Sequence, residues 1–165
     1  MNSKIKMITT NGFIAALYVV FTLAIAPFAF GQIQFRITEV LVLICFFRKD
    51  YAFGLTIGCA IANIFSEMGI VDVAFGSLAT LLACLGIMFS KHLVVAIFFP
   101  IIANAFIVGA ELYFVLGLPF WINVLYVGIG EFGVMVIGYV AFMLLKRSSR
   151  FMDLIGATQN REFKF

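Results

Sequence analysis

Charged residues are scarce in this sequence: they make up 12% of 165 residues, whereas hydrophobic residues make up 64%. A typical soluble domain has roughly 25% charged and roughly 45–50% apolar residues. The chain also contains 21 Phe, most of which would have to face lipid to keep the protein from precipitating. These values exclude an ordinary soluble protein. They predict an all-α integral membrane protein, and we expect no nucleic-acid partner.

Residues that commonly catalyse reactions or bind metals are also few. His92 is the only histidine, and Cys45, Cys59 and Cys84 lie inside apolar runs without the spacing of metal ligands. No G-x-x-x-x-G-K-[ST] motif occurs, so the sequence has no P-loop for ATP. No Ser/His/Asp or Cys/His set can be assembled on one side of a membrane. We therefore expect no enzyme activity, no metal centre and no cofactor.

The few charges divide the chain into six apolar runs. A membrane-spanning helix needs ~20 residues, so the second and third runs are short, and we expect them to be tilted or irregular at their outer ends. Residues 4–26 resemble a signal peptide, but the apolar run continues past a normal signal core, so we expect it to remain as the first helix. The runs span about 9–28, 35–47, 51–66, 70–90, 93–116 and 119–145.

The basic residues indicate the orientation. If the N-terminus is cytoplasmic, ten of the 11 Lys and Arg residues lie on the cytoplasmic side, where positive charge is favoured. The exception is Arg36. The sequence therefore predicts six transmembrane helices within residues 1–147, both termini in the cytoplasm, and a short cytoplasmic tail at 148–165. The ten residues are Lys4, Lys6, Arg48, Lys49, Lys91, Lys146, Arg147, Arg150, Arg161 and Lys164.

Five of the eight acidic residues lie toward the opposite side. At ~1.5 Å per residue, Glu131 lies near the middle of the membrane, where an ionised side chain is costly unless it faces a polar cavity or partner. Glu131 is therefore either a protonated acid bonded to a neighbouring helix or a ligand-binding carboxylate. Glycines at 128, 130 and 133 would leave room beside it for a flat ligand. Five carboxylates lie in predicted outer loops or outer halves of helices, namely Glu39, Glu67, Asp72, Glu111 and Glu131.

A second polar segment, residues 31–39, interrupts the apolar runs. Arg36 and Glu39 are three residues apart, so on a helix they would lie side by side. They would form either an interfacial ion pair at the start of the second helix or contacts to a substrate. Glu67 is interpreted as a solvated loop charge.

Small residues on two predicted helices indicate close helix packing. Gly54, Gly58 and Ala62 are spaced four apart on the third helix. Gly12 and Ala16 give the first helix a similar face, which could pack inside the protein or against another membrane subunit.

Together these features indicate a six-helix protein with an acidic pocket facing outward and no energy source of its own. Such a chain either captures a solute for another machine to move, or couples transport to protons through Glu131. Many proton-coupled transporters have duplicated halves, which we do not find in this sequence. A membrane enzyme acting on a lipid or isoprenoid would need a catalytic constellation, and a purely structural protein would not need five carboxylates at one face.

Three spaced motifs resemble those of the QueT group. They are Gln34-Phe-Arg36-Ile-Thr38-Glu39, Gly54-Leu-Thr-Ile-Gly58-Cys-Ala-Ile-Ala-Asn63 and Asp72-Val-Ala-Phe-Gly76-Ser77-Leu-Ala-Thr80-Leu. The resemblance covers about residues 10–145. Members of this group are the substrate-binding S components of energy-coupling factor (ECF) transporters and are predicted to import queuosine precursors.

The resemblance implies an S-component-like bundle in a prokaryotic plasma membrane that captures a queuosine precursor, queuine or another 7-deazaguanine, at its extracellular face. A transmembrane coupling subunit and two cytoplasmic ATPase subunits would then drive import. The usual docking signal on the first helix is Ala-x-x-x-Ala. In this chain the nearest equivalent is the series Gly12, Ala16 and Val20.

The chemistry of a 7-deazaguanine agrees with the polar residues. Its N1–H and 2-amino groups are parallel donors for a carboxylate, and we predict Glu131 or Glu111 for this edge. The cationic aminomethyl group of queuine and its amine precursor requires a second carboxylate, for which we predict Glu39 or Asp72. Aromatic side chains could stack on the ring. The predicted substrate-binding residues are Gln34, Arg36, Glu39, Asn63, Asp72, Asn104, Glu111, Tyr113, Trp121, Asn123 and Glu131.

Overall fold

All regular secondary structure in the described part of the chain is helical. The computed structural model describes residues 3–29 and 35–159. This confirms the prediction of an all-α protein. The elements are α1 (Ser3–Ala24), α2 (Ala26–Ala29), the 3-10 helix η1 (Ile37–Phe46), α3 (Tyr51–Asn63), α4 (Ile70–Phe89), α5 (Leu93–Ala96), α6 (Phe98–Leu116), α7 (Phe120–Leu145) and α8 (Ser149–Leu154).

Six apolar helical segments make up the membrane bundle. Within the described residues, four segments are long and apolar enough to span a membrane: Lys4–Ala24, Ile70–Phe89, Leu93–Leu116 and Phe120–Leu145. The other two, η1 and α3, are shorter. At ~2.0 Å per residue for a 3-10 helix and ~1.5 Å for an α-helix, each covers about 20 Å of a hydrocarbon core that is ~30 Å thick. The predicted shortness of the second and third runs is confirmed.

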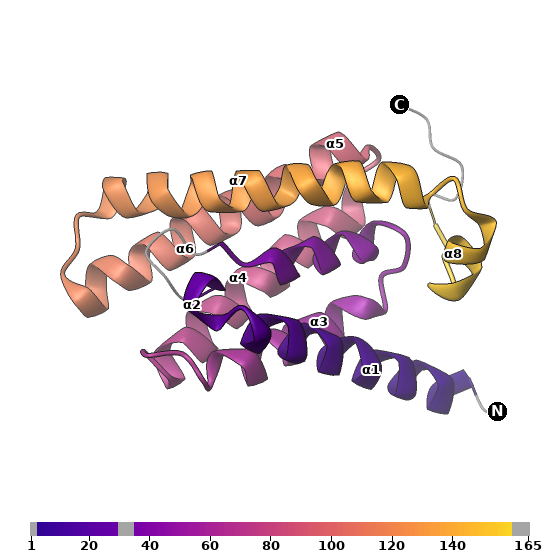
Figure 1. Ribbon diagram of the computed structural model, residues 1–165, viewed down its shortest axis with the longest axis horizontal. Coiled ribbons are helices and arrows are strands. Elements are labelled where there is room, and N and C mark those ends of the chain that lie inside the picture. The colour runs from indigo at the N-terminus through magenta and orange to yellow at the C-terminus, as the bar shows by residue number, and fades with distance from the viewer. Residues whose placement is uncertain (1–2, 30–34, 160–165) are drawn as a thin grey trace.

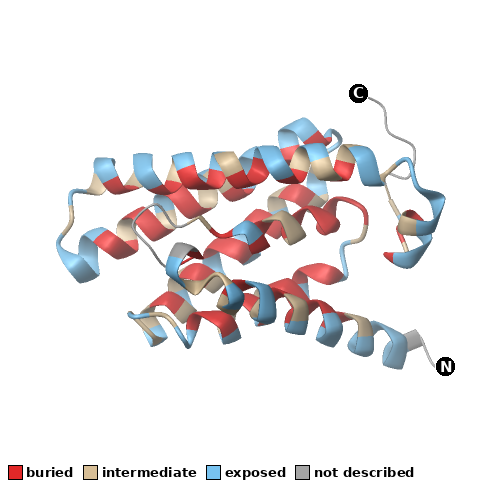
Figure 2. Cartoon of the chain, in the orientation of Figure 1, coloured by how far each residue is buried: buried red, intermediate tan, exposed pale blue. Residues whose placement is uncertain are grey.

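The other helices of the bundle pack in series around η1. Helix α1 packs on α3, α3 on α4, α4 on α6 and α6 on α7, while η1 contacts α1, α3, α4 and α7. Buried residues line the inside of the bundle, and η1 is buried over most of its length (Figure 2). The polar residues of η1 therefore lie in the centre of the protein.

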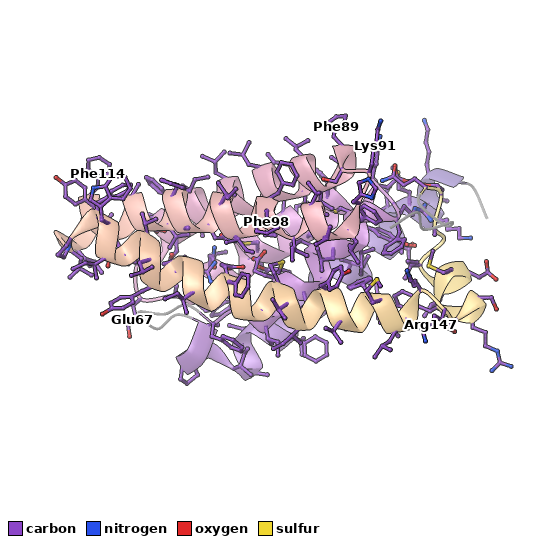
Figure 3. All side chains as sticks on the ribbon, turned by 90° about the horizontal axis from the view of Figure 1, so that it is seen from above. Glu67, Phe89, Lys91, Phe98, Phe114 and Arg147 are labelled. Atoms are coloured by element: carbon purple, nitrogen blue, oxygen red, sulfur yellow. The ribbon has the colours of Figure 1, made fainter. Side chains whose placement is uncertain are left out.

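The start of α1 and helix α8 lie at the same end of the elongated bundle (Figure 1). Lys91 and Arg147 lie toward this end, whereas Glu67 lies toward the other (Figure 3). Phe89 and Phe114 project from the outside of the bundle and are 77% and 75% exposed, as expected for side chains that face lipid. This arrangement agrees with the charge asymmetry of the sequence, which places basic residues at one end of the bundle.

The outer turn between α6 and α7 depends on two special residues. Gly117 adopts the left-handed conformation, with φ of 68°, and its N–H donates to Tyr113 O at the end of α6. Glycine favours this position because it carries no Cβ. Pro119, which has no N–H to lose, precedes the first turn of α7.

The predicted small face of α3 packs against α1. A Cβ at Gly54 would lie 2.6 Å from Asn11 O, and a Cβ at Gly58 would lie 2.9 Å from Ala15 O. The Gly54 N–H donates to Asn11 Oδ1 at 2.8 Å. Larger residues at either glycine would push the two helices apart.

The tail folds back onto the inner end of η1. Gln159 Nε2 donates to the carbonyl oxygens of Cys45 and Phe46, each at 3.1 Å. The N–H groups of Thr158 and Gln159 both donate to Phe47 O. The last carbonyls of a helix have no partner within it, so the tail satisfies groups that would otherwise be exposed or unpaired.

Candidate functional site

The structure buries eight of the eleven predicted substrate-binding residues in the bundle. Each of the eight is at most 6% exposed, although together they bring four carboxylates and a guanidinium into an apolar core. They come from η1, α3, α4, α6 and α7, so elements far apart in the sequence supply one polar region. The eight are Arg36, Glu39, Asn63, Asp72, Asn104, Glu111, Asn123 and Glu131.

The other three predicted residues are not part of this buried set. Gln34 lies outside the described residues. Tyr113 is 47% exposed and Trp121 is 72% exposed. Both rings contact Phe120 edge-on near the outer turn. The structure therefore does not bring the two predicted stacking residues to the buried carboxylates.

Arg36 links the start of η1 to two other elements. It is the N-cap residue of η1, and its Nε donates to Ala29 O at 3.2 Å. Its Nη2 lies 3.8 Å from Asp72 Oδ1 on α4. The ion pair that Arg36 makes with Asp72 is therefore between helices, rather than along η1 as the three-residue spacing to Glu39 suggested.

Glu39, in the first turn of η1, is completely buried. Its Oε1 accepts a short hydrogen bond from the Tyr18 hydroxyl of α1 and another from Thr80 Oγ1 of α4 at 3.4 Å. Its Oε2 has no hydrogen-bond partner among the described residues. Glu39 therefore connects η1 to α1 and α4 by hydrogen bonds, and its Oε2 is available to accept a hydrogen bond from a ligand.

The sequence analysis did not identify Tyr18 or Thr80 as parts of the site. A signal was present for α1, because Tyr18 and Thr22 are one turn apart in an otherwise apolar run. The Thr22 hydroxyl lies 2.9 Å from that of Thr38, which precedes Glu39. Two polar side chains at this spacing indicate a helix face directed into a polar core.

Asn63 and Arg36 pack against α4 because Gly76 leaves space for them. Asn63 Nδ2 donates to Asp72 O at 2.8 Å. A Cβ at position 76 would lie 2.2 Å from Asn63 Nδ2 and 3.4 Å from Arg36 Nη1. The glycine thus allows two polar side chains to approach the backbone of α4 one turn from Asp72.

Close contacts set the register of the antiparallel helices α6 and α7. A Cβ at Gly109 would lie 2.8 Å from Val124 Cγ2, and a Cβ at Gly128 would lie 3.6 Å from Ala105 Cβ. Residues 109 and 124 therefore lie at one level along the bundle axis. Residues 105 and 128 lie at a second level, farther from the turn between α6 and α7. Because both helices rise ~1.5 Å per residue, this register also gives the levels of their polar residues.

Two polar levels follow from that register. Glu111 comes close to the level of Asn123, and Asn104 close to that of Glu131. Both carboxylate oxygens of Glu111, Glu131 Oε2 and the amide nitrogens of Asn104 and Asn123 have no hydrogen-bond partner among the described residues. Leaving a buried polar group unsatisfied costs ~1–3 kcal/mol. These atoms are available to bind a ligand that supplies both donors and acceptors.

Electrostatic interactions connect the two levels to Arg36. Glu111 interacts with Asp72 and with Arg36. Glu131 interacts with Glu39 and with Arg36. One guanidinium therefore interacts electrostatically with four carboxylates, of which Asp72 lies 3.8 Å from Nη2.

The glycines beside Glu131 leave less room than the sequence suggested. The nearest side-chain atom to a Cβ at Gly128 is Ala105 Cβ, and at Gly133 it is Phe35 Cε2 at 3.5 Å. Protein atoms already pack against these two positions.

Within residues 3–29 and 35–159, no three His, Cys, Asp or Glu side chains are placed to hold a metal ion.

Comparisons with known proteins agree with the pattern of motifs. The QueT transporter family matches residues 8–147. The chain is 35% identical over 166 residues to the queuosine precursor transporter QueT of Lactococcus lactis subsp. cremoris (strain MG1363), an alignment that covers 90% of this chain and 95% of that relative. No solved structure matches the chain.

Proposed function

We propose, because the chain belongs to the QueT transporter family, that it carries a queuosine precursor into the cell. Membership of a transporter family, with several apolar spanning helices, makes the chain a multi-pass cell-membrane transporter and not an enzyme. We propose further that it is the substrate-binding S component of an ATP-driven ECF importer. In this proposal residues 1–147 form the binding domain and residues 148–165 a cytoplasmic tail.

The observation that supports capture of a 7-deazaguanine is the set of buried polar atoms without partners. The guanine-like edge offers two parallel donors, which a carboxylate of Glu131 or Glu111 would accept. The O6 carbonyl requires a donor, and Asn104 and Asn123 each have an amide nitrogen available. Glu39 or Asp72 would receive an aminomethyl group. Gln34 and Asn63 complete the proposed polar contacts, and the stacking role of Tyr113 and Trp121 loses support from their exposure.

ATP-driven coupling requires partners, because the sequence has no P-loop of its own. Helix α1 offers a surface for a transmembrane coupling subunit, since Gly12 and Ala16 are exposed on its outer side and Val20 is 63% exposed. Small residues allow two helix backbones to approach closely in lipid. Two cytoplasmic ATPase subunits would then supply the energy.

A stand-alone proton-coupled transporter is the alternative. Glu131 supports it, because a carboxylate 1% exposed in the middle of a spanning helix is typical of a proton carrier. The two functions differ in their energy source. Uptake that follows the proton gradient in cells without an ECF module would favour the alternative, and uptake that requires the ATPases would favour the importer.

Calorimetry with the purified chain tests substrate capture directly. We would titrate it with queuine, 7-cyano-7-deazaguanine and 7-aminomethyl-7-deazaguanine with no ATPase present. Tight binding to the isolated chain is expected of an S component, since capture precedes coupling. A well-folded protein that binds none of the three would contradict the proposed substrate.

A further inference from the structure

The buried core of this protein contains more negative than positive groups. Glu39, Asp72, Glu111 and Glu131 are each at most 2% exposed. Among the described residues, Arg36 is the only buried Lys or Arg. If all four carboxylates were ionised, this region would carry a large net negative charge away from water, which is energetically prohibitive.

The other titratable groups that face this region do not supply positive charge. From α1, the Tyr18 hydroxyl donates to Glu39. From α3, Cys59 is a buried thiol whose sulfur accepts from Asn63 and lies 3.2 Å from Thr80 Oγ1. The remaining groups are the four carboxylates and Arg36, on η1, α4, α6 and α7. The surplus negative charge must therefore be removed by protons.

The hydrogen bonds indicate which carboxylates retain their charge. Asp72 pairs with Arg36, and Glu39 accepts hydrogen bonds from two hydroxyls. In contrast, neither oxygen of Glu111 has a hydrogen-bond partner in the described part of the chain, whereas Glu39 and Glu131 each lack a partner for one oxygen, Oε2. A buried carboxyl group without donors is more stable as the neutral acid. Glu111 is therefore the carboxyl group that holds a proton when the site has no ligand.

A separate observation indicates that this region receives a ligand. The amide nitrogens of Asn104 and Asn123, which are 2% and 6% exposed, also have no hydrogen-bond partner in residues 3–29 and 35–159. They lie at the same two levels as the two carboxyl groups. Donors and acceptors are thus both available there, as a polar heterocycle requires.

We infer that a cationic queuosine precursor binds in exchange for a proton, which leaves from Glu111. This rests on the proposed function. In this arrangement Glu131 accepts the guanine-like edge and Asp72 receives the ammonium group. Glu111, which interacts electrostatically with Asp72, gives its proton to solvent, and the resulting carboxylate joins Asp72 in pairing with the ammonium. The ammonium keeps its own protons, so the net charge of the site does not change. A neutral precursor brings no charge and requires no such exchange.

The test compares two ligands that differ in charge, 7-aminomethyl-7-deazaguanine and 7-cyano-7-deazaguanine. Binding enthalpies are measured in phosphate and in Tris at one pH, because these buffers absorb different heats when they take up a proton. The amine ligand is expected to release about one proton more per site than the cyano ligand. Its affinity should also rise by about tenfold per pH unit relative to that of the cyano ligand, over the pH range where Glu111 is protonated in the empty site.

Two variants identify the group that releases the proton. Glu111→Gln should abolish the difference between the two ligands, whereas Glu67→Gln, which changes an exposed loop carboxylate, should preserve it. Equal proton release by both ligands in the unmodified protein would overturn the inference, even if a variant fails to fold. Failure of either ligand to bind would instead contradict the proposed function itself.

Discussion

Replacing Glu131 by Gln tests the proposed recognition of the guanine-like edge. The substitution keeps the size of the side chain but replaces one of its two acceptor oxygens with an NH2 group. One of the two ligand donors would then face a donor. A hydrogen bond to a charged group contributes roughly 1.5–3 kcal/mol, so loss of the carboxylate should cost on the order of 3 kcal/mol. The dissociation constant should rise on the order of a hundredfold.

Calorimetry on Glu131→Gln, on Glu67→Gln and on the unmodified chain would measure this change. Glu67 is an exposed outer carboxylate, so its substitution changes the formal charge by the same amount without entering the core. Thermal denaturation would show whether the variants remain folded. Removing an unpaired buried carboxyl group should not reduce stability. A folded Glu131→Gln protein that binds as tightly as the parent would refute the assignment of Glu131 to the ligand.

Three further substitutions test other parts of the structure. Gly76→Ala places a Cβ 2.2 Å from Asn63 Nδ2, so ligand affinity should fall, and unchanged affinity would contradict this packing. Tyr18→Phe removes a hydrogen-bond donor from a buried carboxylate, so it should lower the free energy of unfolding by ~1–3 kcal/mol in denaturant melts. Tyr126→Phe is the control, because this residue is 44% exposed and its substitution should change the free energy of unfolding little. Ala16→Leu should reduce uptake by cells that contain an ECF module but leave ligand binding to the purified chain intact; normal uptake would exclude α1 as the docking surface.

The sequence predicted the apolar helical segments well because their bounds depend on a simple physical quantity. Charged groups avoid hydrocarbon, so the apolar runs could be delimited from the positions of a few residues. The short runs at η1 and α3 were also predicted, because their length follows directly from those charges. The length of the second run does not, however, reveal that it is a 3-10 helix, because the helix type depends on how its backbone is packed.

Most of the predicted site residues are buried in the bundle for a geometric reason. Buried polar residues are costly in lipid, so Glu131 and Glu111 were good candidates from composition alone. The aromatic candidates Tyr113 and Trp121 are each two residues from a buried polar residue. Two residues on an α-helix are separated by about 200° of rotation, so side chains at this spacing point to nearly opposite sides. This periodicity places both rings on the outside of the bundle, as the structure shows.

The part of the site that sequence reasoning could not supply is the support of η1 by distant residues. Near its outer end, Tyr18 of α1 donates to Glu39, and Arg36 pairs with Asp72 of α4. At its inner end, Gln159 of the tail caps the last carbonyls. Each contact joins residues far apart in the chain, and none follows from local periodicity. Because η1 is held at both ends, displacement of the tail removes a restraint from the same helix that positions the site.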